Sequence, residues 1–189
     1  MVVVSFLKEP RRAVLQAARA VLTGKLIVYP TDTLYGIGCD ATNTEAVRRV
    51  YEVKRRDRQA PLSVMMADIK MIEDYCIVDD KQMQYLRKYL PGPYTLILKC
   101  RTGREIPASA NRKLGVRIPK HAFCELLLKH CRVPVVTTSA NISKRNPPAS
   151  FNDIEKSIIE SVSVAIDSGP CEYGKPSTII DLVEGRVIR

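Results

Sequence analysis

Segments with helical spacing alternate with short apolar runs along nearly the whole chain, and this alternation constrains the fold more than any other feature. Pro10 suits the first turn of a helix, and apolar residues then recur every three or four positions as far as Gly24. The run Lys25–Tyr29 that follows has the pattern of a buried strand. Such alternation is typical of an α/β domain, and 189 residues suffice for one with a sizeable core. We therefore predict a single domain over residues 1–189, with a mixed sheet flanked by helices.

The other expected elements follow from the same patterns. Pro91-Gly92-Pro93 is a firm break between a helix and a strand. Residues 30–40, with the close glycine pair Gly36 and Gly38, and residues 101–114 are expected to be irregular. Further helices are predicted at 43–54, 69–75, 80–90, 122–130 and 151–161, and further strands at 62–66, 94–100, 115–118, 133–138, 163–167, 178–182 and 186–188.

The composition, with 46% apolar and 26% charged residues, is ordinary for a globular domain. No apolar run approaches the length of a membrane span, and the first residues lack the long apolar segment and cleavage site of a signal peptide. Six cysteines are scattered without a CxxC pair, which in such a chain indicates reduced thiols rather than a disulfide framework. We therefore expect a cytoplasmic protein.

One group of candidate metal ligands, His121, Cys124, His130 and Cys131, lies within eleven residues. The group falls on a predicted helix, and its spacing matches no familiar zinc signature. Thiols packed on an amphipathic helix explain the group better than a structural zinc does. No metal site is therefore predicted.

The net charge of +10 is unevenly distributed. Residues 48–58 hold six Lys and Arg against two acids, and residues 101–150 hold ten against two. Residues 151–189, in contrast, hold seven acids against four bases. So uneven a basic surface favours a nucleotide, an RNA or both as partners. A solvated basic face without a partner is the alternative.

Two short stretches in the basic regions can carry chemistry. Lys54-Arg55-Arg56, closely followed by Pro61-Leu62, lies at the end of a predicted helix, where an unravelled turn would let Lys54 and Arg56 point into one pocket. Ser139-Ala140-Asn141 follows an apolar strand, at the strand end where α/β folds bind ligands. A hydroxyl-rich capping turn explains this second stretch equally well. The sequence contains neither a P-loop nor a GxGxxG fingerprint, and neither histidine has an evident nucleophile.

Arg117 stands inside an apolar strand pattern, Gly115-Val116-Arg117-Ile118-Pro119. A buried arginine needs an anionic partner. A structural salt bridge would supply one, and so would the carboxylate or phosphate of a ligand, which arginine binds bidentately. The sequence leaves both interpretations open.

Six motifs follow one another along the chain: Pro30-Thr31-Asp32-Thr33-Leu34-Tyr35-Gly36, Lys54-Arg55-Arg56 with Pro61-Leu62, Pro91-Gly92-Pro93-Tyr94-Thr95, Val116-Arg117-Ile118-Pro119, Ser139-Ala140-Asn141 and Ser177-Thr178-Ile179-Ile180-Asp181. As a set they are highly specific, and with them the chain closely resembles the YrdC/Sua5 family from about residue 10 to residue 189. The resemblance implies a twisted mixed sheet with a basic concave groove. It also implies the single-domain, TsaC-like form, without the C-terminal domain of longer Sua5 proteins.

The resemblance further implies the family's reaction. Members join L-threonine, bicarbonate (or CO2) and ATP into threonylcarbamoyladenylate and release pyrophosphate, as nucleotidyltransferases in the t6A modification of ANN-decoding tRNA. A separate complex then transfers the threonylcarbamoyl group to the tRNA. Such chemistry needs charge neutralisation around the phosphates more than a covalent nucleophile. Mg²⁺ is expected to arrive with ATP, since the chain has no clustered acidic motif.

By the same resemblance, Lys54 and Arg56 are the expected catalytic cations, and Arg117 is expected to pair with the threonine carboxylate. The expected ATP-binding residues are Lys54, Arg56, Ser139, Asn141 and Arg189, and the expected threonine-binding residues are Thr33, Arg117, Thr137 and Ser177.

The chain departs from the family pattern at three positions. Many relatives have proline where this chain has Asp57, histidine or asparagine where it has Ala60, and histidine near Met65. Contacts there are expected through the backbone or not at all. Keeping Ser139-Ala140-Asn141 favours the synthase branch over the YciO-type paralogues. Two other functions stay open: a non-catalytic module that binds double-stranded RNA or tRNA, and a carbamoyltransferase that works through a carbamoyl-adenylate.

Overall fold

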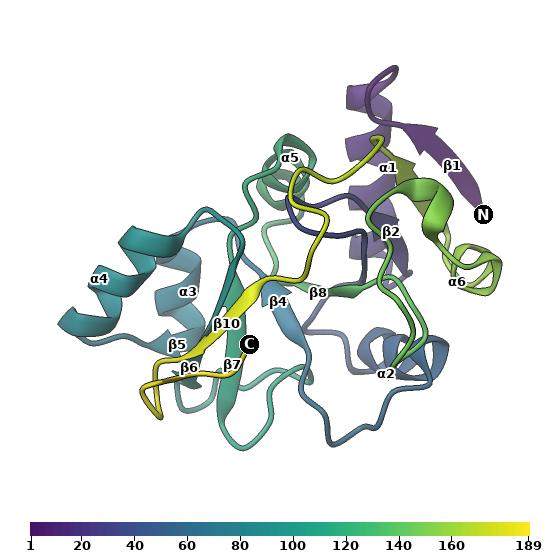
Figure 1. The fold of residues 1–189 in the computed structure, drawn as a ribbon. Helices are drawn as coiled ribbons and strands as arrows, with labels where there is room; N and C mark the ends of the chain where they lie inside the picture. Colours follow the sequence, from purple (N-terminus) through teal and green to yellow (C-terminus); the bar gives the residue numbers. More distant parts are fainter.

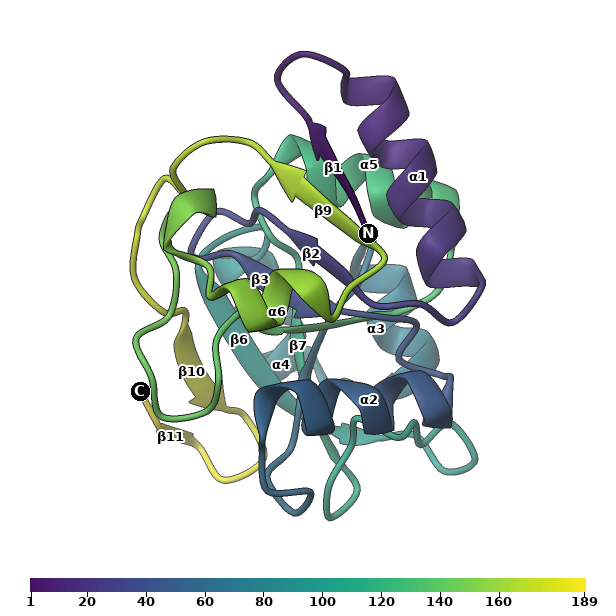
Figure 2. The ribbon, with the colours of Figure 1, turned by 90° about the vertical axis from the view of Figure 1, so that its right-hand side faces the viewer.

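The computed structural model describes residues 1–189 and contains eleven strands in one sheet, with helices on both faces (Figures 1 and 2). The elements are β1 Val2–Ser5, α1 Pro10–Leu22, β2 Ile27–Tyr29, β3 Gly36–Gly38, α2 Thr44–Lys54, β4 Ser63–Met65, α3 Ile69–Tyr75, β5 Cys76–Ile77, α4 Asp80–Tyr89, β6 Tyr94–Cys100, β7 Lys113–Arg117, α5 Ala122–Cys131, β8 Val135–Ser139, the 3-10 turn η1 Phe151–Asp153, α6 Lys156–Glu160, β9 Val164–Asp167, β10 Thr178–Asp181 and β11 Arg186–Val187.

The sheet is mixed, as the sequence predicts. Its strand order is β1-β9-β2-β3-β8-β4-β7-β6-β10-β11, and β5 pairs with the far end of β6. The pairs β1–β9, β2–β9, β4–β7 and β6–β10 are parallel, and the remaining pairs are antiparallel. The prediction of a mixed sheet flanked by helices is therefore confirmed.

The two faces of the sheet are covered to different extents. One face is covered by α2, α3, α4 and α6, which pack onto it in a single large core. On the opposite face α1 and α5 pack together over β1, β9 and β2 (Figure 2). Alternation along β7 shows what the helices leave open, because Leu114 and Val116 belong to the large core while Lys113, Gly115 and Arg117 line a pocket on the other side. The part of the sheet that α1 and α5 do not cover is therefore the place for a site.

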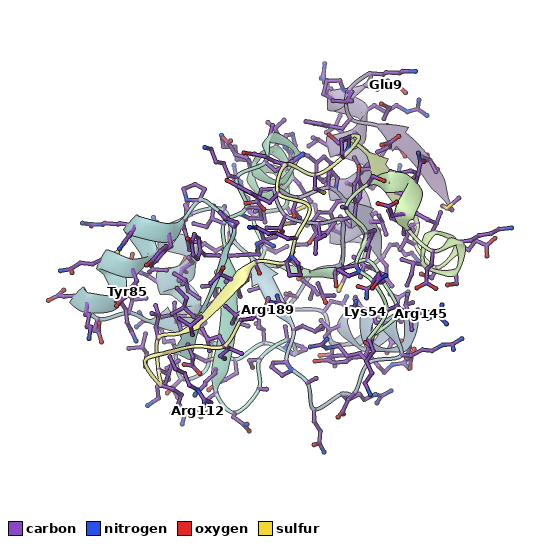
Figure 3. All side chains as sticks on the ribbon, in the orientation of Figure 1. Glu9, Lys54, Tyr85, Arg112, Arg145 and Arg189 are labelled. Atoms are coloured by element: carbon purple, nitrogen blue, oxygen red, sulfur yellow. The ribbon has the colours of Figure 1, made fainter.

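The two ends of helix α2 are set by local backbone features, and its C-terminal end determines where Lys54 and Arg56 lie. Asn43 caps its start, since the Asn43 side chain accepts a hydrogen bond from the Ala46 N–H at 2.9 Å. At its end Arg55 adopts the left-handed conformation, with φ 48°. Lys54, labelled in Figure 3, is thus the last helical residue, and Arg56 lies beyond the turn.

Residues 30–40, which we expected to be irregular, include the short strand β3. A Cβ added at Gly38 would lie 2.0 Å from the carbonyl oxygen of Val136, and one at Gly36 would lie 3.1 Å from the ring of Tyr29. The two glycines therefore allow β3 to lie tightly between β8 and the Tyr29 ring, whose hydroxyl donates to the Val136 carbonyl at 2.9 Å. The glycine pair serves close packing rather than a turn.

Other differences concern short elements. The predicted helix over 151–161 is broken: Asp153 Oδ2 accepts from the Ser150 N–H at the start of η1, Ile154 is extended, and α6 begins only at Lys156. The strands β1 and β5 were not predicted, because each is short and depends on a partner strand elsewhere in the chain. None of the helices has the length and hydropathy needed to cross a bilayer.

Candidate active site

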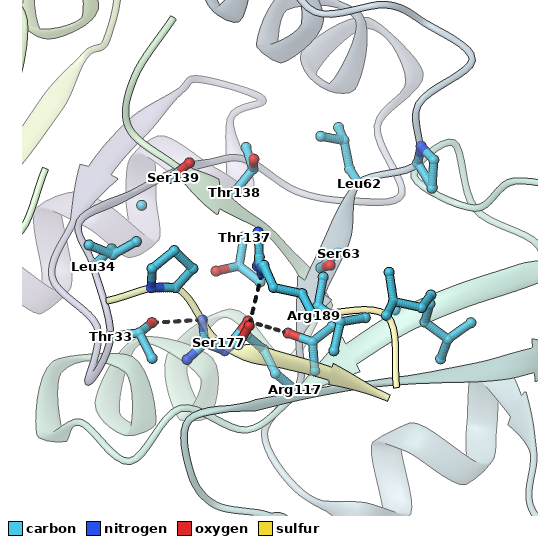
Figure 4. A pocket seen from close by; sticks show the side chains of 18 of the residues that line it. Thr33, Leu34, Leu62, Ser63, Arg117, Thr137, Thr138, Ser139, Ser177 and Arg189 are labelled. Carbon is cyan, nitrogen blue, oxygen red and sulfur yellow. Dashed lines mark hydrogen bonds between the residues drawn. The ribbon is translucent and has the colours of Figure 1, made fainter. Parts of the chain in front are cut away.

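A pocket of about 890 Å³ occupies the uncovered part of the sheet (Figure 4). Its floor carries small and hydroxyl-bearing residues, Ser63, Thr95, Gly115 and Thr137, which point from four neighbouring strands. Any side chain at Gly115 would crowd this floor, because its Cβ would lie 2.9 Å from the Ser63 hydroxyl. The volume lies in the range typical of sites for small molecules.

The pocket brings together eight of the nine site residues that the sequence suggested. They come from distant parts of the chain, from the loop after β2 to the residues after β11, and Figure 4 shows several of them facing one another across the pocket. The eight are Thr33, Arg56, Arg117, Thr137, Ser139, Asn141, Ser177 and Arg189. The ninth, Lys54, does not line the pocket.

Arg117 is buried and pairs with a carboxylate of the protein itself. Its Nη2 lies 2.6 Å from Asp32 Oδ1, and its Nη1 donates to the Thr33 hydroxyl at 3.1 Å. The Arg117 Nε is buried and has no partner. The salt-bridge interpretation is thus confirmed, while the guanidinium keeps N–H donors for a ligand.

Asp32 is the site residue that sequence reasoning missed. Its side chain is fully buried, and its second oxygen accepts from the Lys120 backbone N–H at 3.2 Å. It therefore compensates the charge of Arg117 and fixes the direction of its guanidinium. The sequence did contain a signal for this pair. Asp32 stands between two threonines just after a predicted buried strand, and Arg117, inside another predicted strand, needs an anionic partner.

The hydroxyl groups of the pocket are held in fixed positions by one another. Thr31 and Thr33 share a hydrogen bond of 3.0 Å, and Thr31 also donates to the Leu34 carbonyl at 2.8 Å. Thr95 and Ser177 share another of 2.8 Å between β6 and the residue before β10. The Thr33 and Ser177 hydroxyls thus face the pocket from a prearranged network.

Five cationic side chains line the pocket, and they differ in how far their charge is neutralised. Three are paired with carboxylates: Lys113 with Asp181 and Glu184, Arg117 with Asp32, and Arg145 with Glu155.

The other two pocket cations, Arg56 and Arg189, have no carboxylate partner. Arg56 Nη2 donates to the Pro61 carbonyl at 2.9 Å, and Arg189 Nε donates to the Ser177 carbonyl at 3.2 Å. Partial burial and the nearby Arg117 lower the pKa of Arg189. Uncompensated positive charge inside a concave site attracts anions, so Arg56 and Arg189 are the two pocket cations best suited to phosphates.

Lys54 lies behind the pocket wall, and the expectation that it would point into one pocket with Arg56 is wrong. Its side chain is buried, and Nζ donates to the backbone carbonyls of Ser139 and Asn141, the latter at 2.8 Å. Lys54 still belongs to α2, whose geometry directs its side chain, and the left-handed Arg55 that follows sends Arg56 in another direction. Burial, with a smaller effect of Arg56, lowers the pKa of Lys54 to about 7.

The Ser139-Ala140-Asn141 stretch fits both of its interpretations. It begins with the last residue of β8 and turns the chain, and its Ser139 and Asn141 line the pocket. The Asn141 Nδ2 donates to the carbonyls of Ile142 and Arg145 at 2.9 and 2.7 Å, while its Oδ1 is buried without a partner. An unpaired acceptor of this kind suits a donor group of a ligand.

The three departures from the family pattern have simple structural consequences. The Ala60 carbonyl accepts from Arg56 Nε at 3.5 Å, so this position contributes through the backbone. Asp57 accepts from the Gln59 N–H at 2.9 Å, and Met65 packs in the core beside α5. None of the three brings a side chain into the pocket.

The candidate zinc ligands do not form a cluster. His121 Nδ1 accepts from the Phe123 N–H at 3.1 Å and caps α5, and Cys124 donates to the Pro30 carbonyl at 3.3 Å. No three His, Cys, Asp or Glu side chains gather where they could hold a metal ion, and all six cysteines are free thiols.

Comparison with known proteins identifies a matching family, curated relatives and similar solved structures. The family model Sua5_yciO_yrdC, described as "Telomere recombination", matches residues 19–189. A Methanocaldococcus jannaschii protein, whose name proposes threonylcarbamoyl-AMP synthase activity, is 42% identical over 96% of this chain and 86% of its own length. The threonylcarbamoyl-AMP synthase of Bacillus subtilis is 30% identical over 89% of this chain and 50% of its own. The crystal structure of P. abyssi Sua5 complexed with L-threonine superposes with a TM-score of 0.88 and 27% identity, over 100% of this chain and 57% of that one.

The fold and the site together define an α/β protein with a pocket, lined by five cationic side chains, on the open face of a mixed sheet. The chain spans about half the length of the Bacillus and Pyrococcus proteins. With the match over residues 19–189, the chain belongs to the Sua5/YciO/YrdC family.

Proposed function

We propose that the protein is an L-threonylcarbamoyladenylate synthase, a nucleotidyltransferase that serves the t6A modification of tRNA. It would join L-threonine, bicarbonate or CO2 and the Mg²⁺ complex of ATP into threonylcarbamoyl-AMP and release pyrophosphate. The names of the relatives and the threonine bound to P. abyssi Sua5 support this proposal. A separate complex would then consume the adenylate.

One observation carries the proposal: the pocket joins a carboxylate-binding corner to an anion-binding corner. In the first corner Arg117, oriented by Asp32, lies beside the Thr33 hydroxyl. In the second, Arg56 presents positive charge without a carboxylate partner. Arg189, also without one, lies near Arg117 and adds positive charge beside the first corner. The carboxylate of an amino acid and the phosphates of a nucleoside triphosphate would thus bind to different arginines of the same pocket.

The proposed chemistry follows from these charges. The threonine amine adds to CO2 and gives a carbamate, and a carbamate oxygen attacks the α-phosphorus of ATP. The bond from this phosphorus to the bridging oxygen breaks, and pyrophosphate leaves. Arg56 and Arg189 would neutralise charge that moves onto the phosphates, which is the main demand of such a step.

The residues present also fit Mg²⁺ as part of the substrate. The carboxylates on the pocket wall, Asp181 and Glu184, are both paired with Lys113, and no cluster of acidic ligands forms. The ion would thus be held mainly by triphosphate oxygens and water.

Selectivity for threonine would come from its hydroxyl. The Ser177 hydroxyl, held by Thr95, faces the pocket and could pair with the side-chain hydroxyl of threonine. A site that hydrogen-bonds a hydroxyl rejects valine strongly, whereas it discriminates serine by a methyl group, about 1–3 kcal/mol.

A pyrophosphate-release assay tests the proposal. Release should require ATP, bicarbonate and L-threonine together, and the product should be an AMP ester that carries label from both threonine and bicarbonate. Serine should give slower turnover, and carbamoyl phosphate should not replace bicarbonate. If no threonine-dependent AMP ester forms, the proposal fails.

Two variants sharpen this assay. Arg56→Met removes an uncompensated pocket cation and should lower kcat/KM for ATP by about 100-fold. Arg58→Met is the matched control, because Arg58 lies in the same segment but is exposed, pairs with Glu52 and does not line the pocket. A non-catalytic RNA-binding module would instead bind RNA without ATP or threonine, with an affinity that falls steeply with salt.

A further inference from the structure

Lys54 is a buried cation that the proposed reaction leaves without a direct part. Only 1% of the residue is exposed, and it does not line the pocket. Both hydrogen bonds of its Nζ go to backbone carbonyls, those of Ser139 and Asn141. No carboxylate pairs with Lys54, so a salt bridge does not explain its burial.

The contacts of Lys54 join two segments that are far apart in sequence. Its Nζ holds carbonyls on both sides of Ala140, and its own carbonyl accepts from the Ser143 N–H at 2.8 Å. Ala140 is fully buried, and its N–H donates to the Tyr35 carbonyl at 2.8 Å. The end of α2 and the turn after β8 are thus locked together, directly beneath the pocket wall.

The geometry also matches the donors that a lysine can offer. Two carbonyls occupy two of the N–H groups, which both the charged and the neutral amine possess. The lowered pKa of Lys54 is consistent with a group whose hydrogen bonds matter more than its charge. The third N–H of the charged amine is buried behind the wall, so for a phosphate contact the side chain would have to move away from carbonyls that it now satisfies in the interior.

We infer that Lys54 is a positioning residue for the proposed reaction: it holds the Ser139–Asn141 turn in the shape that binds substrates and touches no substrate itself. The inference rests on the proposed function only for the identity of the ligands. Arg56, two residues further on, contacts the pocket directly and provides the contrast.

The matched variants Lys54→Met and Arg56→Met, titrated with ATP and with adenosine, test the inference. Removal of a phosphate-binding cation weakens the binding of ATP but not that of adenosine, which has no phosphate. We expect this selective loss of ATP affinity for Arg56→Met. A positioning residue affects both ligands, so Lys54→Met should weaken ATP and adenosine by the same factor, about 10- to 100-fold. Loss of ATP affinity alone in Lys54→Met would overturn the inference.

Hydrogen exchange supplies a readout that does not depend on the ligands. In Lys54→Met the backbone N–H groups of Ala140 and Ser143 should exchange at least tenfold faster than in the wild type, while those of α1 stay protected. Unchanged exchange at both residues would overturn the inference even if the wild type bound neither ATP nor threonine. Failure of wild-type binding alone would instead refute the proposed function.

Discussion

Neutralising Asp32 tests how strongly the site depends on one buried ion pair. The substitution Asp32→Asn keeps the shape of the side chain but removes its charge. It leaves the Arg117 guanidinium, 2.6 Å away, without a counter-ion in a buried setting. In the wild type the Lys120 N–H donates to Asp32 Oδ2. In the variant the amide can place an N–H group at this position, so that two donors face each other.

The expected cost follows from the burial of the two partners. The Asp32 and Arg117 side chains are 0% and 8% exposed, so solvent cannot compensate for the lost charge. Breaking a buried pair on one side costs about 3–5 kcal/mol, and the retained amide oxygen favours the lower end, about 3 kcal/mol. For a chain of this size that corresponds to a fall in Tm of about 6–12 °C.

Thermal and urea unfolding of the pure proteins would measure this cost. Glu125→Gln is the matched control, because it neutralises an exposed i,i+4 pair with Lys129 and should leave Tm unchanged. The double variant with Arg117→Met should be more stable than Asp32→Asn, since no uncompensated charge remains buried. A Tm of Asp32→Asn within 2 °C of the wild type, a margin of roughly 1 kcal/mol or less, would refute the reasoning.

Three further predictions follow from the structure. Gly38→Ala should lower the free energy of unfolding by about 3 kcal/mol in urea titrations, because its Cβ would lie 2.0 Å from the Val136 carbonyl oxygen; a loss below 1 kcal/mol would contradict this. The folded-state pKa of Lys54, about 7, lies below its ordinary 10.5, so the unfolded chain binds the extra proton between these pH values. Wild-type stability relative to Lys54→Met should therefore rise from pH 7 to pH 10, and a constant difference would count against the lowered pKa. Cys171 alone is not fully buried, so a thiol reagent should modify one cysteine in the native protein and six in denaturant; rapid modification of several native thiols would disprove the burial.

Local signals in the sequence predicted most helices, because their caps lie within the same few residues. Asn43 begins α2, and Asp79 with Gln82 forms a capping box at the start of α4. Strands β1, β3 and β5 could not be predicted in this way. Each has two to four residues, and each exists because a partner strand from another part of the chain pairs with it.

The candidate site was predictable as a set of residues but not as a set of directions. Motif order suggested Arg56 and Ser139, and both line the pocket. The motif could not show that α2 directs Lys54 behind the wall while a left-handed Arg55 turns Arg56 toward the pocket, since the backbone dihedrals of one residue leave no periodic pattern in the sequence. Nor could it pair Arg117 with Asp32, a contact made across the sheet.

The pairing order of the sheet has a consequence for how the protein is made. Val2 of β1 pairs with Val164 of β9, and Tyr94 of β6 pairs with Thr178 of β10. During synthesis β1 therefore stays without its partner until β9 has been made, and the pocket lacks part of its wall until β10 has been made. Contacts so distant in sequence slow folding and leave unpaired strand edges exposed in the nascent chain.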